Sequence, residues 1–182
     1  MSKARSLALL VAIAVASAAG GAGYFLWLRG ADTVTDRPLT SQTVVERVYA
    51  ARLADLKGAP QSMRQWRGQV LVVNFWATWC APCREEIPGF VRLQERYGAR
   101  GVRFVGIAFD QPEKVTEFAR EFGINYPLLT GGLDTMELLR EAGNRAGVLP
   151  YTVVIDRAGN LVSRQPGGLK EATLEGIIQP LI

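Results

Sequence analysis

The chain has 182 residues, a formal net charge of +4, two cysteines and no histidine. Without histidine it lacks the usual acid–base catalyst, the commonest metal ligand and the Cys-x-x-Cys-His signal for haem attachment. The positive charge does not indicate nucleic-acid binding. Lys3, Arg5 and Arg29 flank one apolar segment, and basic and acidic residues alternate along the rest of the chain.

An uncharged apolar segment at residues 6–28 comes first in the chain. Its length suits a helix that crosses a bilayer, and Tyr24 and Trp27 suit the aromatic belt at a membrane interface. A cleaved signal peptide is the alternative, because Ala-Ser-Ala at residues 16–18 offers a small-x-small cleavage site. The apolar run continues beyond that site, so an uncleaved signal anchor is favoured.

Three regions are predicted: a signal anchor or transmembrane helix at residues 1–29, a polar linker at residues 30–40, and a folded domain at residues 41–182. The very short flank before the anchor favours export of the large domain that follows it. The cysteine usage fits an oxidising compartment, because a single redox-type pair can work there without structural disulfides.

Within the domain, apolar β-branched runs alternate with amphipathic stretches. The predicted strands lie at residues 44–53, 70–76, 102–109, 126–129, 151–156 and 161–164. The predicted helices lie at residues 62–66, 81–97, 112–122, 134–141 and 170–178, and Pro88 is expected to kink the second of these. This order predicts an α/β fold, with a sheet that carries helices on both faces.

The most informative motif is Trp-Cys-Ala-Pro-Cys at residues 79–83, which contains both cysteines. It lies where the strand predicted at residues 70–76 ends and the helix predicted at residues 81–97 begins. A thiolate at such a position faces unsatisfied backbone N–H groups and the positive end of the helix dipole. Both effects lower the pKa of the thiol and favour nucleophilic attack near neutral pH. The motif therefore predicts a redox-active dithiol.

Three other roles compete with this one: half of a zinc site, a structural disulfide, and two inert buried thiols. A closed zinc site needs four ligands, so this chain would need a second chain to complete it. A structural disulfide closing so small a loop would constrain the unfolded chain little. Inert thiols fit badly with Ala81 and Pro82 at a helix start. The dithiol is favoured, and neither a metal nor another cofactor is expected.

The position of each cysteine in the helix predicts its role. Cys80, at the mouth of the helix, would attack a target disulfide, and Cys83, one turn further in, would resolve the mixed disulfide. Pro82 removes a backbone donor at little cost and keeps the turn rigid. Trp79 is expected to shield the disulfide and to offer a flat contact surface, against the alternative of an ordinary, partly buried tryptophan.

Residues 73–88, Val-Asn-Phe-Trp-Ala-Thr-Trp-Cys-Ala-Pro-Cys-Arg-Glu-Glu-Ile-Pro, resemble the active-site segment of the thioredoxin superfamily. They resemble most closely its TlpA/ResA-like branch of membrane-anchored, extracytoplasmic thiol-disulfide oxidoreductases. Residues 147–156 resemble the cis-proline loop and following strand of that family, and residues 109–143 resemble the helix-containing insert of the branch. The resemblance implies a thioredoxin-like fold: a central mixed sheet with helices on both faces, an N-terminal β-hairpin extension and the insert, preceded by one transmembrane helix.

The resemblance also implies further site residues. A cis bond between Leu149 and Pro150 would expose the Leu149 backbone beside the dithiol, where a substrate segment can pair in β fashion. Thioredoxin carries a buried aspartate as proton acceptor where this chain has Asn74, so the general base is open. The glutamates at residues 85–86 lie close in sequence. Asp110, at the end of a neighbouring strand, is the named candidate, against its alternative role as a helix cap and against a water as acceptor.

The leading prediction is a disulfide reductase of the bacterial inner membrane, with a single-pass anchor and its catalytic domain in the periplasm. If the anchor is cleaved, the protein would be soluble in the periplasm. By resemblance, a membrane electron carrier of the DsbD/CcdA type would reduce it. Its substrates would include haem-attachment cysteines of apocytochrome c or copper-site cysteines of oxidase subunits. We expect a monomer that acts on protein disulfides.

Three other functions were weighed against the reductase. A dithiol oxidase is the main alternative, but strong oxidants place a histidine between the cysteines, where this chain has Ala81 and Pro82. A copper-delivery protein on the same fold would resemble Cys-x-x-x-Cys with a distant histidine, which this chain lacks. A thiol peroxidase would use a single reactive cysteine in a different loop. The reductase is favoured over all three.

Overall fold

The computed structural model describes residues 20–21, 24 and 40–182. The chain divides into two units, residues 1–38 and 39–182, and all of the described strands belong to the second unit. The signal anchor predicted at residues 1–29 and the linker predicted at residues 30–40 lie almost wholly outside the described residues. Among the residues that the structure describes, no helix has the length and apolar character needed to cross a membrane.

A seven-stranded mixed sheet forms the centre of the second unit, in the order β2-β1-β5-β4-β3-β6-β7. β3 pairs in parallel with β4, and β4 with β5, whereas the other neighbours are antiparallel. The predicted mixed sheet is therefore confirmed, including the N-terminal hairpin of β1 and β2. The strands are β1 (Arg52–Asp55), β2 (Pro60–Ser62), β3 (Val70–Trp76), β4 (Val102–Ala108), β5 (Leu128–Thr130), β6 (Tyr151–Ile155) and β7 (Leu161–Pro166).

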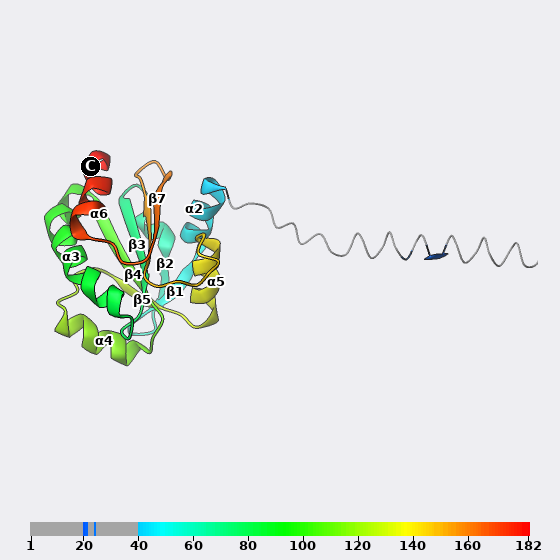
Figure 1. Cartoon of the computed structure of the whole chain (residues 1–182), viewed down its shortest axis with the longest axis horizontal. Coiled ribbons are helices and arrows are strands. Elements are labelled where there is room, and N and C mark those ends of the chain that lie inside the picture. The colour runs from blue at the N-terminus through cyan, green and yellow to red at the C-terminus, as the bar shows by residue number, and fades with distance from the viewer. Residues whose placement is uncertain (1–19, 22–23, 25–39) are drawn as a thin grey trace, which may run out of the picture. The chain divides into compact units, whose positions relative to one another are not determined.

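Helices cover both faces of the sheet, as predicted (Figure 1). One layer contains α3 (Ala81–Tyr97), α4 (Pro112–Glu121) and α6 (Glu171–Ile178). The other contains α2 (Ser41–Ala50) and α5 (Leu133–Glu141). Three short 3-10 helices complete the described fold: η1 (Met63–Trp66), η2 (Gly98–Arg100) and η3 (Gln179–Leu181).

Side chains alternate along β3 and divide the core between the two layers. The even-numbered apolar residues of β3 belong to the cluster that packs with α3, α4 and α6. The odd-numbered residues Leu71, Val73 and Phe75 belong to the cluster that packs with α2 and α5. Every residue of β3 is buried, as expected for a central strand covered on both faces. Asn74 is even-numbered, so this one polar residue of β3 faces the α3 layer.

The strand predicted at residues 44–53 is wrong over most of its length, because residues 41–50 form α2. Thr40 caps this helix, since its hydroxyl accepts a hydrogen bond from the Thr43 N–H at 3.1 Å. The valines favour a strand in isolation, but burial of one helical face outweighs β propensity. That buried face consists of Val44, Val45, Val48 and Tyr49. The other predicted elements agree with the observed bounds to within two residues.

Candidate redox-active site

Cys80 and Cys83 form a disulfide at the start of α3, just after β3 ends. Cys80 is the N-cap residue in an extended conformation, and the Arg84 N–H donates to its carbonyl oxygen at 3.2 Å. Pro82 lies in the first turn, where a missing backbone N–H leaves no hydrogen bond unmade. β3 therefore delivers the disulfide to the positive end of a helix, where a thiolate would be stabilised.

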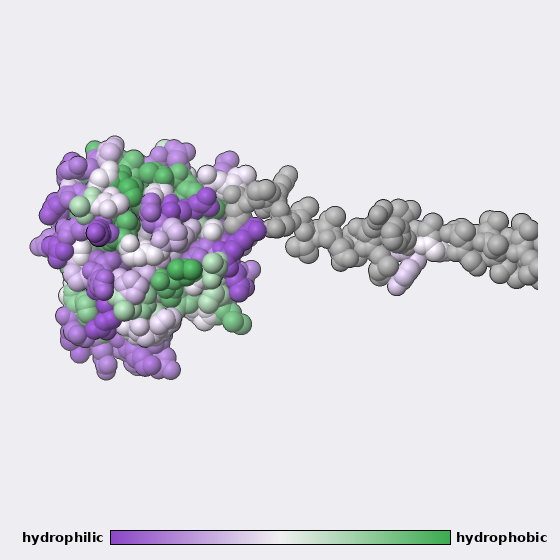
Figure 2. Space-filling model, in the orientation of Figure 1, coloured by the Kyte–Doolittle hydropathy of each residue, from purple (hydrophilic) through white to green (hydrophobic). Residues whose placement is uncertain are grey.

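Exposure differs sharply along this motif. Cys83 is fully buried and Cys80 is 6% exposed, whereas Trp79 is 70% exposed. The alternative of a partly buried tryptophan is therefore wrong, and the indole lies open to a partner. On the face shown in Figure 2, apolar surface occurs in limited areas among polar ones. Single exposed apolar side chains are ordinary on a folded domain, so the position of Trp79 beside the disulfide is the informative fact.

The loop that contains Leu149 and Pro150 lies at the same end of the sheet. The bond between these residues is cis, as the resemblance implied. Tyr151 is opposite Phe75 in the register of β6 and β3, so the preceding Pro150 lies beside the end of β3 that continues into the disulfide motif. Leu149 is partly buried and packs against the apolar cluster that includes both cysteines. The fold therefore brings two distant predicted segments together.

A third segment, between β7 and α6, lies against both the disulfide motif and the loop that contains Pro150. The Gly167 N–H donates to the Pro150 carbonyl oxygen at 2.8 Å. A Cβ atom added to Gly168 would lie 3.5 Å from Cβ of Pro82, so this backbone runs close to the disulfide motif. Nothing in the sequence analysis pointed to residues 167–169 as part of the site.

Glu86 is the residue whose environment the sequence analysis missed. It lies one turn after Cys83 on α3 and is only 5% exposed. One carboxylate oxygen accepts a hydrogen bond from Asn74 Nδ2 at 2.8 Å, and the other accepts from the Leu169 N–H at 2.8 Å. The Asn74 amide also donates to the Thr152 hydroxyl at 3.1 Å. A buried polar network thus joins β3, α3, β6 and the segment before α6.

Burial raises the pKa of Glu86 to about 7, and the hydrogen bonds from Leu169 and Asn74 offset this only in part. Burial and the nearby charge of Glu86 also raise the pKa of Tyr126. Glu86 lines a pocket of about 350 Å³ together with Pro82 and Gly168. The site therefore holds a carboxyl group that can gain or lose a proton near neutral pH, one turn of α3 after the buried cysteine.

Asp110, the predicted proton acceptor, has a different setting. Its carboxylate accepts hydrogen bonds from the Thr78 hydroxyl and, at 2.9 Å, from the Gln111 N–H. Lys114 Nζ lies 3.9 Å from the same carboxylate. These contacts join the end of β4 to the loop that precedes Cys80. Asp110 does not cap α4 in the predicted way, because Gln111 is the N-cap residue and no side chain caps this helix.

Two signals in the sequence could have found Glu86. Glu86 and Ile87 follow Cys83 at spacings of three and four residues, so both fall on the buried face of the helix. Asn74 interrupts an otherwise apolar buried strand, and a buried amide requires a partner. Each signal alone fits many structures. Only the packing of α3 on β3 brings the two residues together.

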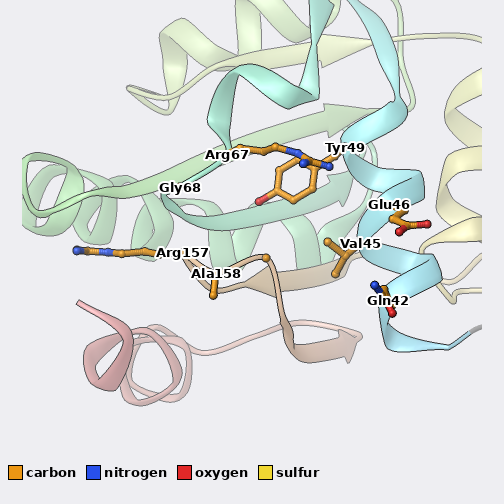
Figure 3. Close-up of a pocket in the computed structure, with 9 residues that line it drawn as sticks. Gln42, Val45, Glu46, Tyr49, Arg67, Gly68, Arg157 and Ala158 are labelled. Atoms are coloured by element: carbon orange, nitrogen blue, oxygen red, sulfur yellow. The ribbon is translucent and has the colours of Figure 1, made fainter.

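The pocket shown in Figure 3 lies at the opposite end of β3. Its volume is about 340 Å³, and Tyr49 from α2, Arg67 and Gly68 are among its lining residues. Gly68 lies two residues before β3 begins, whereas Cys80 lies four residues after β3 ends. This pocket is therefore separated from the disulfide by the length of the strand and is not part of the redox site.

Comparison with known proteins points to the same chemistry. Residues 40–178 match the family model described as Redoxin. The chain is 32% identical over 124 residues to the thiol-disulfide oxidoreductase ResA of Geobacillus kaustophilus, which covers 68% of this chain and 69% of that protein. It is 33% identical over 165 residues to the thiol:disulfide interchange protein HelX of Rhodobacter capsulatus, which covers 89% of this chain and 88% of that protein.

A solved structure agrees with these relatives. The thiol:disulfide interchange protein of the thioredoxin family from Chlorobium tepidum TLS is 34% identical and superposes with a TM-score of 0.63, covering 72% of this chain and 92% of that one. The predicted resemblance to the TlpA/ResA-like thioredoxins is therefore confirmed, and so is the class of reaction.

Proposed function

This chain belongs to the Redoxin family and is a thiol-disulfide oxidoreductase, and we propose that it acts as a disulfide reductase. The observation that carries the proposal is the composition of the first turn of α3. Ala81 and Pro82 separate the two cysteines and offer no side-chain donor to the thiolate. A thiolate without a donor from between the cysteines is stabilised less than one that has such a donor, so this dithiol should give up its electrons more readily than that of a strong oxidant.

The proposed exchange runs through a mixed disulfide. The Cys80 thiolate attacks one sulfur of the target disulfide, so an intermolecular S–S bond forms and one target thiolate leaves. The Cys83 thiolate then attacks Sγ of Cys80, which releases the second target thiolate and forms the Cys80–Cys83 disulfide. Two electrons pass from the dithiol to the target. Because Cys83 is fully buried, Cys80 is the sulfur we assign to the first attack.

We assign Glu86 as the acceptor for the proton of Cys83. It lies one turn further along the buried face of α3, and its pKa of about 7 suits proton transfer near neutral pH. The pocket that it shares with Pro82 gives the proton a route to solvent. Asp110, which accepts a hydrogen bond from Thr78 and lies near Lys114, stays the alternative acceptor that the sequence suggested.

The surface around the disulfide supports a protein substrate. Trp79 offers an exposed flat ring, and Pro82 lies in the exposed first turn of α3. Leu149 and Pro150 lie at the adjoining end of β6. We propose that these four residues contact the polypeptide that flanks the target cysteines, which would fix one partner sulfur near Cys80.

The proposed location follows from the sequence of the N-terminal region. Residues 1–29 would anchor the protein in the bacterial inner membrane, residues 30–40 would link the anchor to the domain at 41–182, and the domain would face the periplasm. A membrane electron carrier of the DsbD/CcdA type would reduce the disulfide again. Cysteines of apocytochrome c or of copper sites in oxidase subunits would be its targets, and the protein would act as a monomer.

The reduction potential of the full-length protein in detergent tests the direction of electron flow. The protein would be equilibrated in glutathione and dithiothreitol buffers, with tryptophan fluorescence as the readout. A potential at or below about −200 mV supports the reductase. A potential near about −120 mV would overturn it in favour of the oxidase. If no reversible transition occurs, the two cysteines do not form a working couple.

A further inference from the structure

The loop that leads from β3 into the disulfide is held from two sides at Thr78. The Thr78 hydroxyl donates a hydrogen bond to the Asp110 carboxylate. The Thr78 carbonyl oxygen accepts a hydrogen bond from Arg84 Nη1 at 3.3 Å. Arg84 follows Cys83 directly, and Asp110 follows β4, so two different elements hold the residue that precedes Trp79.

The guanidinium group of Arg84 lies over two aromatic side chains of the α4 segment. Its guanidinium carbon lies 5.1 Å from the ring centroid of Phe118 and 5.0 Å from that of Phe122. The two rings stack on each other, with centroids 4.0 Å apart and an interplanar angle of 6°. Distances below about 6 Å are those at which a guanidinium is attracted to an aromatic ring. Phe118 also packs against Trp76, the last residue of β3, at 5.0 Å.

The charge of Arg84 is not neutralised by an acid. Among the residues that the structure describes, no carboxylate lies within ion-pair distance of its guanidinium. The guanidinium group therefore extends from the first turn of the helix that carries both cysteines, without a carboxylate paired to it. A cation in this position adds to the field of the helix terminus on a thiolate.

We propose that Arg84 is a positioning residue for the exchange reaction, and that the stacked pair Phe118–Phe122 sets its orientation. Arg84 holds the Thr78 carbonyl, which fixes the chain that presents Trp79 and Cys80 to the partner. The inserted segment that includes α4 thus controls the reactivity of a disulfide to which it contributes no cysteine. This inference rests on the proposed function, because it concerns the residue that positions Cys80 for its attack on the target disulfide.

The test is the second-order rate constant with which the pre-reduced full-length protein, in detergent, reduces a protein disulfide such as that of insulin between pH 5 and 9. Arg84→Gln is expected to slow the reaction by about tenfold at pH 7 and to move the inflection of the pH profile to higher pH, because a thiolate loses a nearby cation. Arg84→Lys should restore the inflection but only part of the rate. Arg120→Gln, an equal charge change on an exposed residue of α4, is the matched control and should change neither.

A double-mutant cycle separates positioning from loss of charge alone. Phe122→Ala leaves both cysteines and Arg84 in place, yet it removes half of the aromatic support. It should slow the reaction several-fold in the wild-type background and have little further effect when Arg84 is already glutamine. Thermal unfolding of each variant shows whether the fold is retained.

Each outcome bears on one proposal. If wild type fails to reduce the disulfide, the proposed function fails. If wild type is active but Arg84→Gln behaves like Arg120→Gln, the inference about Arg84 is overturned and the proposed function stands. If the effects of Phe122→Ala and Arg84→Gln simply add, the aromatic pair does not act through Arg84. If Arg84→Gln lowers stability while its rate and pH profile are unchanged, its role is structural only.

Discussion

The two faces of the central sheet differ in the kind of residue that they bury. The face under α3, α4 and α6 contains a carboxylate, Glu86, with its hydrogen-bonding partners Asn74 and Leu169. The face under α2 and α5 is filled mainly by aliphatic and aromatic side chains, although Thr135 of α5 is also buried, and no buried carboxylate of the described residues lies there. The strands contribute Asn74 and Thr152 to the α3 face, and α3 adds Glu86, so the difference arises from alternate strand residues as well as from the helices.

The two faces contribute differently to the domain: the α3 face carries its redox chemistry, and the α2 and α5 face contributes mainly to its stability. Burying a carboxyl group costs free energy unless the group is neutral or hydrogen-bonded. A buried carboxyl group such as that of Glu86 therefore points to a functional role. The apolar face has no such cost and contributes the hydrophobic stabilisation that offsets it. We therefore expect substitutions in the polar network of the α3 face to change both redox behaviour and the pH dependence of stability, and substitutions on the α2 and α5 face to change stability alone.

The largest effect is expected at the disulfide itself. Cys83→Ser should abolish turnover and trap the substrate on Cys80 as a stable mixed disulfide, because the resolving thiolate is missing. Cys80→Ser should abolish turnover without trapping any substrate. Non-reducing gel electrophoresis and mass spectrometry distinguish the two variants. A mixed disulfide on Cys83 in the Cys80→Ser protein would reverse the assigned roles.

The next largest effect should come from the apolar face. Leu71 is fully buried on the side of α2 and α5, so Leu71→Ala should lower the free energy of unfolding by about 2–5 kcal/mol. Urea titration measures this loss. The reduction potential of the folded variant should stay within about 30 mV of wild type. A larger change would mean that the two faces are not independent.

A smaller effect, dependent on pH, is expected at Glu86. Its folded pKa of about 7 lies above the ordinary glutamate value of 4.5, so the folded state binds an extra proton between these two pH values. Stability from this group is complete below about pH 4.5 and is lost as the pH rises through 7, a loss of at most about 3 kcal/mol.

Glu86→Gln should therefore flatten the fall in the free energy of unfolding between pH 4.5 and 8. The comparison is made by urea titration at several pH values with the oxidised protein. Glu85→Gln is the matched control, because Glu85 is the exposed neighbour on the same helix. An equal flattening by both variants would show that burial of Glu86 is not the cause.

The smallest of the expected effects is a loss of substrate affinity on substitution of Trp79. Its side chain is 70% exposed, so Trp79→Ala should alter the free energy of unfolding by no more than about 0.5 kcal/mol. Loss of an aromatic contact at an interface typically costs about 1–2 kcal/mol, so KM for a protein disulfide should rise about 5–30-fold. Reduction of a small disulfide such as oxidised glutathione should be unchanged. An equal loss with both substrates would argue against a protein-contacting role.

Much of this fold was predictable because its signals are local. The β-branched run at residues 70–76 and the cysteine motif after it define β3 and the start of α3 without any distant contact. Residues 44–53 show the limit of local signals. Their valines favour a strand in isolation, but residues 41–50 form a helix because one helical face is buried against the rest of the fold. The same limit hid Glu86, because an isolated glutamate in a helix is ordinarily solvated.

Apart from the helix at residues 41–50, the sequence by itself determined the order of strands and helices, the redox pair and the residue types at the helix start, because each depends on neighbours only a few residues away. Tertiary structure alone decided which residues meet at the site. Asn74 and Thr152 are 78 positions apart, and Leu169 and Glu86 are 83 apart, yet each pair is hydrogen-bonded. Such contacts, and the raised pKa of Glu86 that burial produces, arise only when helices close over the sheet and exclude water.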